Sequence, residues 1–302
     1  MNPMTLTNRR PRHRSLAALV GLPAVAVAVL SLGACGSGAA GSDQRPMVTA
    51  TTSIAADIVA RVGGDDVDVV QLVPDGASPH SYAPSAREQQ ELAESALVVY
   101  FSPGLEQSLP IDQAAETFAF ADHTGGIDGA DADPHVWLDP TLIAAAVPDL
   151  AVALAELDPE HAAAFRRRAR AYAGELRALD RQLQEMVASV PVSRRKLVTS
   201  HDLIGYFAAR YGFKVVGAPF GSSPEAEASA GALAELIDRI EAEGVPAVFA
   251  QQGDDPEVLR RVAEEAGVAV VDDLALESLG GVGSYEQMMR TATEKITAAL
   301  GA

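Results

Sequence analysis

The sequence predicts an α/β protein of two lobes, each with a mostly parallel four-stranded sheet, joined by one long bridging α-helix. Three observations lead to this fold class. From Val48 onward, short runs rich in β-branched residues alternate with helical patterns, which is typical of βα units and parallel sheets. The alternation occurs in two separate series. The longest helical pattern of the chain, at 158–190, lies between them.

Length and composition agree with a folded protein of this size. The chain has 302 residues, of which 48% are hydrophobic. It is therefore long enough for one large domain or two of ordinary size, and too apolar for a disordered chain. Its formal net charge of −18 argues against nucleic acid and anionic membrane surfaces as partners.

Residues 1–35 have the pattern of a secretory signal. Four arginines within "RRPRHR" precede an uncharged apolar run from Leu16 to Ala34, and small residues lead to Cys35. A basic start, an apolar run and a small-residue exit are typical of export signals. A transmembrane anchor is the alternative, because about 20 apolar residues could just span a bilayer. The segment at 36–47, which includes "GSGAAGSDQRP", favours the signal because it looks like a flexible tether.

Cys35 is the only cysteine of the chain, and "LGAC" resembles a bacterial lipobox. Lipidation would explain an unpaired cysteine in an exported protein. We therefore expect an exported protein that is lipid-anchored through Cys35 to the outer face of the cell membrane, or periplasmic. Loss of the signal would remove four arginines and no acidic residue, so the mature chain would be still more acidic.

The first lobe is expected at 48–157. Its strands are predicted at 48–52, 67–73, 96–101 and 117–121. A helix is predicted at 53–62, because Ser53 can cap it and the apolar residues at 54, 58 and 62 share one face. A further helix is expected to begin at Pro140 or Thr141.

The bridging helix is expected at 158–190, with Asp158 as its cap and Pro159 in its first turn. Its apolar stripe repeats every four and three residues and consists of Phe165, Ala169, Tyr172, Leu176, Leu179, Leu183, Met186 and Val190. This spacing would equally suit a coiled coil, but the pattern is single and flanked by α/β lobes. Pro191 is expected to end the helix. The helix would then be about 45 Å long.

The second lobe is expected at 191–302. Its predicted strands are 196–200, 213–218, 247–251 and 268–272, and its predicted helices are 202–211, 229–243, 256–266 and 284–300.

Four of the six histidines lie in or beside loops of this predicted fold, and three of them could share one site. His80 and His201 follow strands of different lobes, where parallel α/β proteins bind ligands. His135 lies in "DADPHVWLDP", a loop that could reach the same cleft. Three imidazoles suit a transition metal, chiefly zinc, and Asp272 or Asp273 after the last strand could add a carboxylate. An ordinary hydrogen-bonding role for each histidine is the alternative, because no short-spaced metal motif is present.

The loop around His135 has further expected roles. Trp137 is expected to pack as a buried wedge that fixes the loop. Asp139 is expected to cap the next helix or to orient an imidazole. Asp131 and Asp133 are interpreted as solvated, and His161 as a surface residue.

Several motifs resemble those of bacterial metal-binding receptors of ABC importers, the ZnuA-like and TroA-like lipoproteins of cluster A-I. They are "PHSYAPS", "DPHVWLDP", "LVTSHDLIGYFAARYG", "PEAEASAGALAELIDRIEAEGVPAVFAQ" and "GSYEQMMR", in the family's order across the mature chain. The resemblance implies two α/β lobes bridged by a long helix, with the metal between them. It also implies an ABC transporter permease as partner, no enzymatic activity and a monomer.

The resemblance assigns the ligands individually. His80, His135 and His201 match the three motif histidines, and Asp273 matches the carboxylate by its distance from Tyr285, with Asp272 as the fallback. Manganese-specific relatives have a glutamate at the third position, so a histidine there favours Zn²⁺. Mn²⁺ is the alternative. The family's long histidine-rich loop is reduced here to 121–133. His123 and nearby acids could attract a second ion, or form a solvated acidic turn.

Two other functions compete with transport. Some relatives are called adhesins, so a metal-linked surface adhesin is the main alternative. A secreted zinc hydrolase would need an open coordination position and a general base, for which Glu225 and Glu227 are candidates. A receptor for metal chelates would need a wider cleft with basic residues, which the histidine motifs do not suggest.

Overall fold

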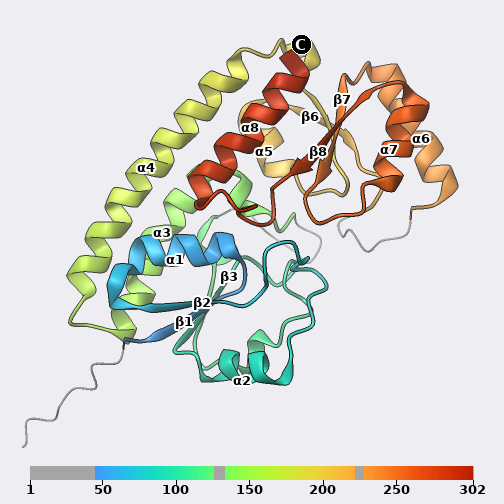
Figure 1. The fold of residues 1–302 in the computed structure, drawn as a ribbon. Coiled ribbons are helices and arrows are strands. Elements are labelled where there is room, and N and C mark those ends of the chain that lie inside the picture. The colour runs from blue at the N-terminus through green and yellow to red at the C-terminus, as the bar shows by residue number, and fades with distance from the viewer. Residues whose placement is uncertain (1–44, 126–132, 222–227, 302) are drawn as a thin grey trace, which may run out of the picture. The chain divides into compact units, whose positions relative to one another are not determined.

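The first lobe contains a parallel four-stranded sheet, as predicted (Figure 1). The computed structural model describes residues 45–125, 133–221 and 228–301, so the expected signal, Cys35 and most of the tether lie outside the described residues. The strands are β1 (Met47–Ala50), β2 (Asp68–Gln71), β3 (Leu97–Tyr100) and β4 (Thr117–Ala119), in the order β2-β1-β3-β4. In the central strand, Val48 pairs with Val69 on one side and Leu97 on the other.

Three helices belong to this lobe: α1 (Ser53–Gly63), α2 (Ala86–Glu94) and α3 (Pro140–Leu157). The start of α3 is confirmed, and Asp139 caps it by accepting a hydrogen bond from the Thr141 amide at 2.8 Å. The predicted cap of α1 is wrong by one residue. The Thr52 hydroxyl accepts from the Ala55 amide, while the Ser53 hydroxyl accepts from the distant Leu279 amide at 3.0 Å.

The long helix α4 (Ala162–Ala188) runs beside both lobes (Figure 1). It begins later than predicted, because Asp158 ends α3: its amide donates to the Leu154 carbonyl. Its carboxylate accepts from the backbone and the ring of His161, which precedes α4. The predicted stripe is buried except for the half-buried Met186. It packs into one apolar core that contains residues of both lobes, so residues 44–302 form one compact unit.

The second lobe is less regular than the first. Its strands are β5 (Lys196–Val198), β6 (Lys214–Gly217), β7 (Ala247–Gln251) and β8 (Ala269–Leu274), and its helices are α5 (Gly205–Tyr211), α6 (Ala230–Glu243), α7 (Glu257–Ala266) and α8 (Tyr285–Gly301). The strands form two parallel pairs, β5-β6 and β7-β8, which a single parallel bridge between Thr199 and Phe249 connects. The register shifts at 197–198 and between 249 and 251.

Short 3-10 helices complete the described chain at Gly64–Asp66, Ile111–Gln113, Phe120–His123, Val136–Leu138 and Val192–Arg194. One of them, at Val136–Leu138, follows His135 directly and contains Trp137. His201 thus lies three residues beyond β5 and His135 directly precedes a short helix, whereas His80 lies nine residues beyond β2.

Candidate metal centre

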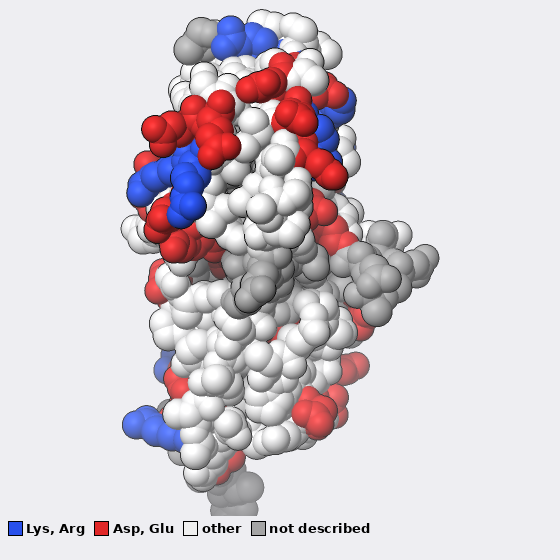
Figure 2. Space-filling view, turned by 90° about the vertical axis from the view of Figure 1, so that its right-hand side faces the viewer, with Lys and Arg blue, Asp and Glu red and all other residues white. Residues whose placement is uncertain are grey.

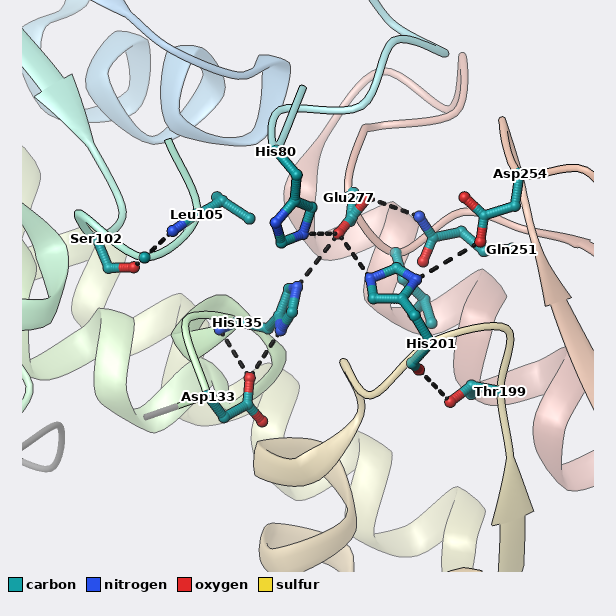
Figure 3. Close-up of polar contacts among 12 residues, drawn as sticks. His80, Ser102, Leu105, Asp133, His135, Thr199, His201, Gln251, Asp254 and Glu277 are labelled. Atoms are coloured by element: carbon teal, nitrogen blue, oxygen red, sulfur yellow. Dashed lines mark hydrogen bonds and ion pairs between the residues drawn. The ribbon is translucent and has the colours of Figure 1, made fainter. Parts of the chain in front are cut away.

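Three histidines and one glutamate meet between the two lobes (Figure 3). The Nε2 atoms of His80, His135 and His201 lie 3.1, 3.2 and 3.2 Å from Oε1 of Glu277. One ligand atom from each residue lies within 4.8 Å of all the others. His135 and His201 are fully buried and Glu277 is 8% exposed. The structure thus brings together the three histidines that the sequence singled out.

The structure does not place Asp273 or Asp272 in this cluster. Both belong to β8, which continues to Leu274 instead of ending at Asp272 as predicted. The Asp273 side chain is 68% exposed, and its backbone has a φ of 63°. The Asp272 carboxylate instead pairs with Arg260 at 3.1 Å. The carboxylate that the structure places with the three histidines is that of Glu277, three residues beyond the end of β8, and Asp273 lies outside the cluster.

The segment that carries Glu277 belongs to the second lobe in sequence, between β8 and α8, but is bonded to the first lobe. Trp137 Nε1 donates to the Leu276 carbonyl at 2.6 Å, and the Leu279 amide donates to Ser53. The hydroxyl of Tyr285, at the start of α8, donates to the Trp137 carbonyl. These bonds tie the segment of Glu277 to the first lobe, which also supplies His80 and His135, whereas His201 follows β5 of the second lobe.

Trp137 is the buried wedge that the sequence predicts, with 1% exposure. Its ring centroid lies 4.5 Å from that of Phe101 and 5.1 Å from that of His135. Packing against Phe101 fixes the indole, and the indole in turn limits the His135 ring. One side chain therefore positions both His135 and, through Leu276, the segment of Glu277.

Carboxylates from outside the cluster lie beside Nδ1 of two imidazoles, and only that of Asp133 is within hydrogen-bond distance. Asp133 Oδ1 lies 2.7 Å from His135 Nδ1, and Asp254 Oδ2 lies 3.6 Å from His201 Nδ1 (Figure 3). A carboxylate at Nδ1 favours a proton on that nitrogen, so that Nε2 can present its lone pair to a cation once it has lost its own proton. The interpretation of Asp133 as solvated is wrong, because its backbone and ring contacts to His135 tie it to the site.

The cluster is electrostatically prepared for a cation. Burial alone would raise the pKa of Glu277, but hydrogen bonds from His135, His201 and His80 hold it well below its usual range. Burial would lower the pKa of His201, but the nearby Asp254 carboxylate and the hydrogen bond to Glu277 raise it to about 9. Asp133 and Glu277 likewise raise the pKa of His135 despite its burial. Without metal, the cluster binds protons that a cation would replace.

Two other histidines lie outside the cluster of His80, His135, His201 and Glu277. His123 stacks on Phe118 with ring centroids 4.3 Å apart, and its Nδ1 pairs with Asp149 at 3.0 Å. His161 is half exposed and pairs with Asp158. Glu225 and Glu227 lie outside the described residues.

Charge on the surface fits an acidic protein. On the face drawn in Figure 2, acidic side chains lie over both lobes, and most basic side chains lie next to acidic ones. The formal net charge of −18 favours a cation over an anion as ligand.

Comparison with known proteins agrees with this geometry. Residues 48–299 match the family described as zinc-uptake complex component A, periplasmic. The chain is 32% identical to the manganese-binding lipoprotein MntA of Bacillus subtilis (strain 168), an alignment that covers 92% of this chain and 98% of that one. It is 30% identical to the zinc-binding protein TroA of Treponema pallidum, over 87% and 92% of the two chains.

Two solved structures show the same fold. The periplasmic zinc-binding protein TroA superposes with a TM-score of 0.80 at 28% identity, covering 85% of this chain and all of that one. The laminin-binding protein Lmb of Streptococcus agalactiae has a TM-score of 0.76 at 27% identity, over 84% and 99% of the chains. Lmb is described as a bifunctional protein with adhesin and metal transporting activity. The relatives are thus metal-binding proteins, although the metals named for them differ.

Proposed function

The chain belongs to the zinc-uptake component A family of metal-binding receptors for ABC importers, and on this premise we propose that it captures Zn²⁺ between its lobes. It then delivers the ion to the membrane permease of an ABC importer. The observation that carries the proposal is the convergence of three imidazole Nε2 atoms on one carboxylate oxygen of Glu277. The family works with ABC transporter permeases and binds transition metals.

The choice of zinc rests on the chemistry of these four side chains. Three neutral imidazoles and one carboxylate make a tetrahedral set of the kind that Zn²⁺ prefers. Such nitrogen-rich sites bind Zn²⁺ more tightly than Mn²⁺, which favours oxygen ligands. The names of the relatives do not decide the metal, because MntA is a manganese-binding protein and TroA a zinc-binding one.

The competing functions receive less support. The family consists of transport receptors and not of enzymes, and four protein ligands would leave no open position on a tetrahedral ion for a hydrolytic water. Adhesion is described for Lmb. Among the described residues, however, only Val152 and Val192 are large apolar side chains with high exposure. That surface offers no apolar patch to favour adhesion.

Export and anchoring follow from the same proposal. Residues 1–35 would be removed as a signal up to Cys35, whose lipidation would tether a monomeric receptor near its permease. Relatives such as MntA are named lipoproteins, which supports this part of the proposal. Because candidate ligands come from both lobes, a bound ion would stabilise one arrangement of the lobes, and the permease could distinguish loaded from empty receptor.

Metal competition tests the proposed function. The protein without residues 1–35 is stripped of metal and titrated with Zn²⁺ in the presence and absence of Mn²⁺. We expect one tightly bound Zn²⁺ per chain, which equimolar Mn²⁺ does not displace. The His135→Ala variant should lose this binding. The matched control His123→Ala removes a histidine outside the cluster and should bind zinc like the parent. Displacement of Zn²⁺ by equimolar Mn²⁺ would contradict the assignment of zinc.

A further inference from the structure

Gln251 lies next to the proposed metal centre on a firmly held backbone. It is the last residue of β7, is 5% exposed, and pairs in register with Leu274 of β8. Its amide donates to the hydroxyl of Ser200, the residue before His201, at 3.1 Å. Strand β8 and the residue before His201 therefore fix the point from which the Gln251 side chain extends.

The side chain of Gln251 bonds to one oxygen of Glu277 and leaves the other to the histidines. Gln251 Nε2 donates to Glu277 Oε2 at 2.7 Å, whereas Glu277 Oε1 faces His80, His135 and His201 (Figure 3). The two oxygens of this carboxylate thus have different partners. One is directed to the metal centre and the other is occupied by an amide.

The orientation of the Gln251 amide follows from the charge of Glu277. If the amide were reversed, its oxygen would face a carboxylate oxygen, and two acceptors cannot bond to each other. The observed orientation leaves Gln251 Oε1 buried without a hydrogen-bond partner among the described residues. The contact to Glu277 is therefore the one that determines how this side chain lies.

We propose that Gln251 determines metal specificity by holding Glu277 as a ligand through one oxygen only. This inference rests on the proposed function of the cluster. A carboxylate with one oxygen committed to a hydrogen bond adds a single bond to the ion, which completes a four-coordinate shell with three imidazoles. Zn²⁺ in proteins is usually four-coordinate, whereas Mn²⁺ favours a larger number of oxygen ligands.

Without the amide donor, Oε2 would be free to turn towards the ion and add a fifth bond. Gln251 also differs from Asp133 and Asp254, which lie behind imidazoles and carry charge. The amide is neutral, so its removal changes the coordination available to Glu277 without changing the net charge of the site. This makes its effect on metal choice separable from a general loss of cation affinity.

The test compares Gln251→Met with Gln252→Met. Methionine keeps the length of the side chain but has no donor. Gln252 is the adjacent residue, and its side chain lies beside Gly280, away from the cluster. Zinc and manganese affinities are measured by competition with a chelator. In Gln251→Met we expect zinc affinity to fall about tenfold and the zinc-to-manganese preference to shift at least as far towards manganese. Gln252→Met should keep the parent's preference.

Two spectroscopic measurements complete the test, one of which needs no variant. X-ray absorption of the zinc-loaded parent should show four ligands with one carboxylate oxygen. The visible bands of Co²⁺ in the site should be intense in the parent, as for four-coordinate Co²⁺, and weaker in Gln251→Met. A carboxylate bound through both oxygens in the parent would overturn the inference, as would an unchanged preference in Gln251→Met. In either case zinc binding by the parent, and with it the proposed function, would stand. A parent that binds neither metal would overturn both proposals.

Discussion

Replacement of Glu277 by glutamine is expected to weaken zinc binding by more than about 100-fold, because it removes the only carboxylate among the four converging side chains. The matched variant Asp273→Asn should leave the affinity unchanged. Loss of residues that merely orient ligands already costs about 10- to 100-fold, so loss of a ligand should cost more. Competition with a fluorescent chelator measures both variants under the same conditions.

The design of this pair separates charge at the site from charge in general. Each substitution removes one negative charge and keeps the side-chain size, but Glu277 is buried and Asp273 is 68% exposed. Thermal unfolding of the metal-free proteins serves as the control for folding. Equal zinc affinity of the Glu277→Gln variant and the parent, or a large loss in Asp273→Asn, would show that the fourth ligand is misassigned.

Zinc affinity is expected to rise about tenfold for each pH unit between about pH 6 and 8, because the imidazoles must lose protons before they bind the ion. The pKa of metal-free His201 is raised to about 9 by Asp254 and Glu277, which outweigh its burial. His201 therefore carries a proton throughout this range and releases it when zinc binds. Calorimetry in buffers with different ionisation enthalpies counts the protons, and an affinity that is constant with pH would contradict the prediction.

The same raised pKa sets how the stability of the metal-free protein depends on pH. A group whose folded-state pKa lies above its unfolded value stabilises the fold fully below the unfolded pKa. For His201 that contribution is present below about pH 6.5 and is lost as the pH rises through about 9. It amounts to roughly 3 kcal/mol. Zinc should reverse this trend, because the bound ion replaces the proton and is held more tightly at higher pH.

Strand ends were the part of the site that the sequence could predict. His80 and His201 follow predicted strands of different lobes, and the rule that ligands bind at the carboxyl ends of parallel strands placed them together. Trp137 could be predicted as a wedge because a large ring between prolines in a loop needs a place to pack.

The fourth position could not be found in this way. Asp273 fits the carboxylate position only if the segment before Tyr285 has the family's length and the last strand ends at residue 272. In the structure β8 continues to Leu274, and Glu277 lies on a segment held by Trp137 and Ser53. These bonds join residues more than a hundred positions apart, which no local pattern reveals. An acidic residue shortly after a strand end was the available signal, and "LALESLG" contains one.

Two other misses also came from contacts that compete with local rules. Asp158 has the sequence context of a helix cap, yet it ends α3, and α4 begins only after His161. Asp133 lies in an acidic loop, yet a contact of 2.7 Å to His135 Nδ1 ties it to the site. In each case the role of the aspartate depends on its hydrogen-bond partner, which the sequence context does not identify.

The most direct test of the central claim is the anomalous diffraction of zinc in crystals of the zinc-loaded protein without residues 1–35. The account predicts one strong peak per chain, bonded to Nε2 of His80, His135 and His201 and to the Glu277 carboxylate. A peak at another place, or a shell that contains Asp273 in place of Glu277, would contradict it.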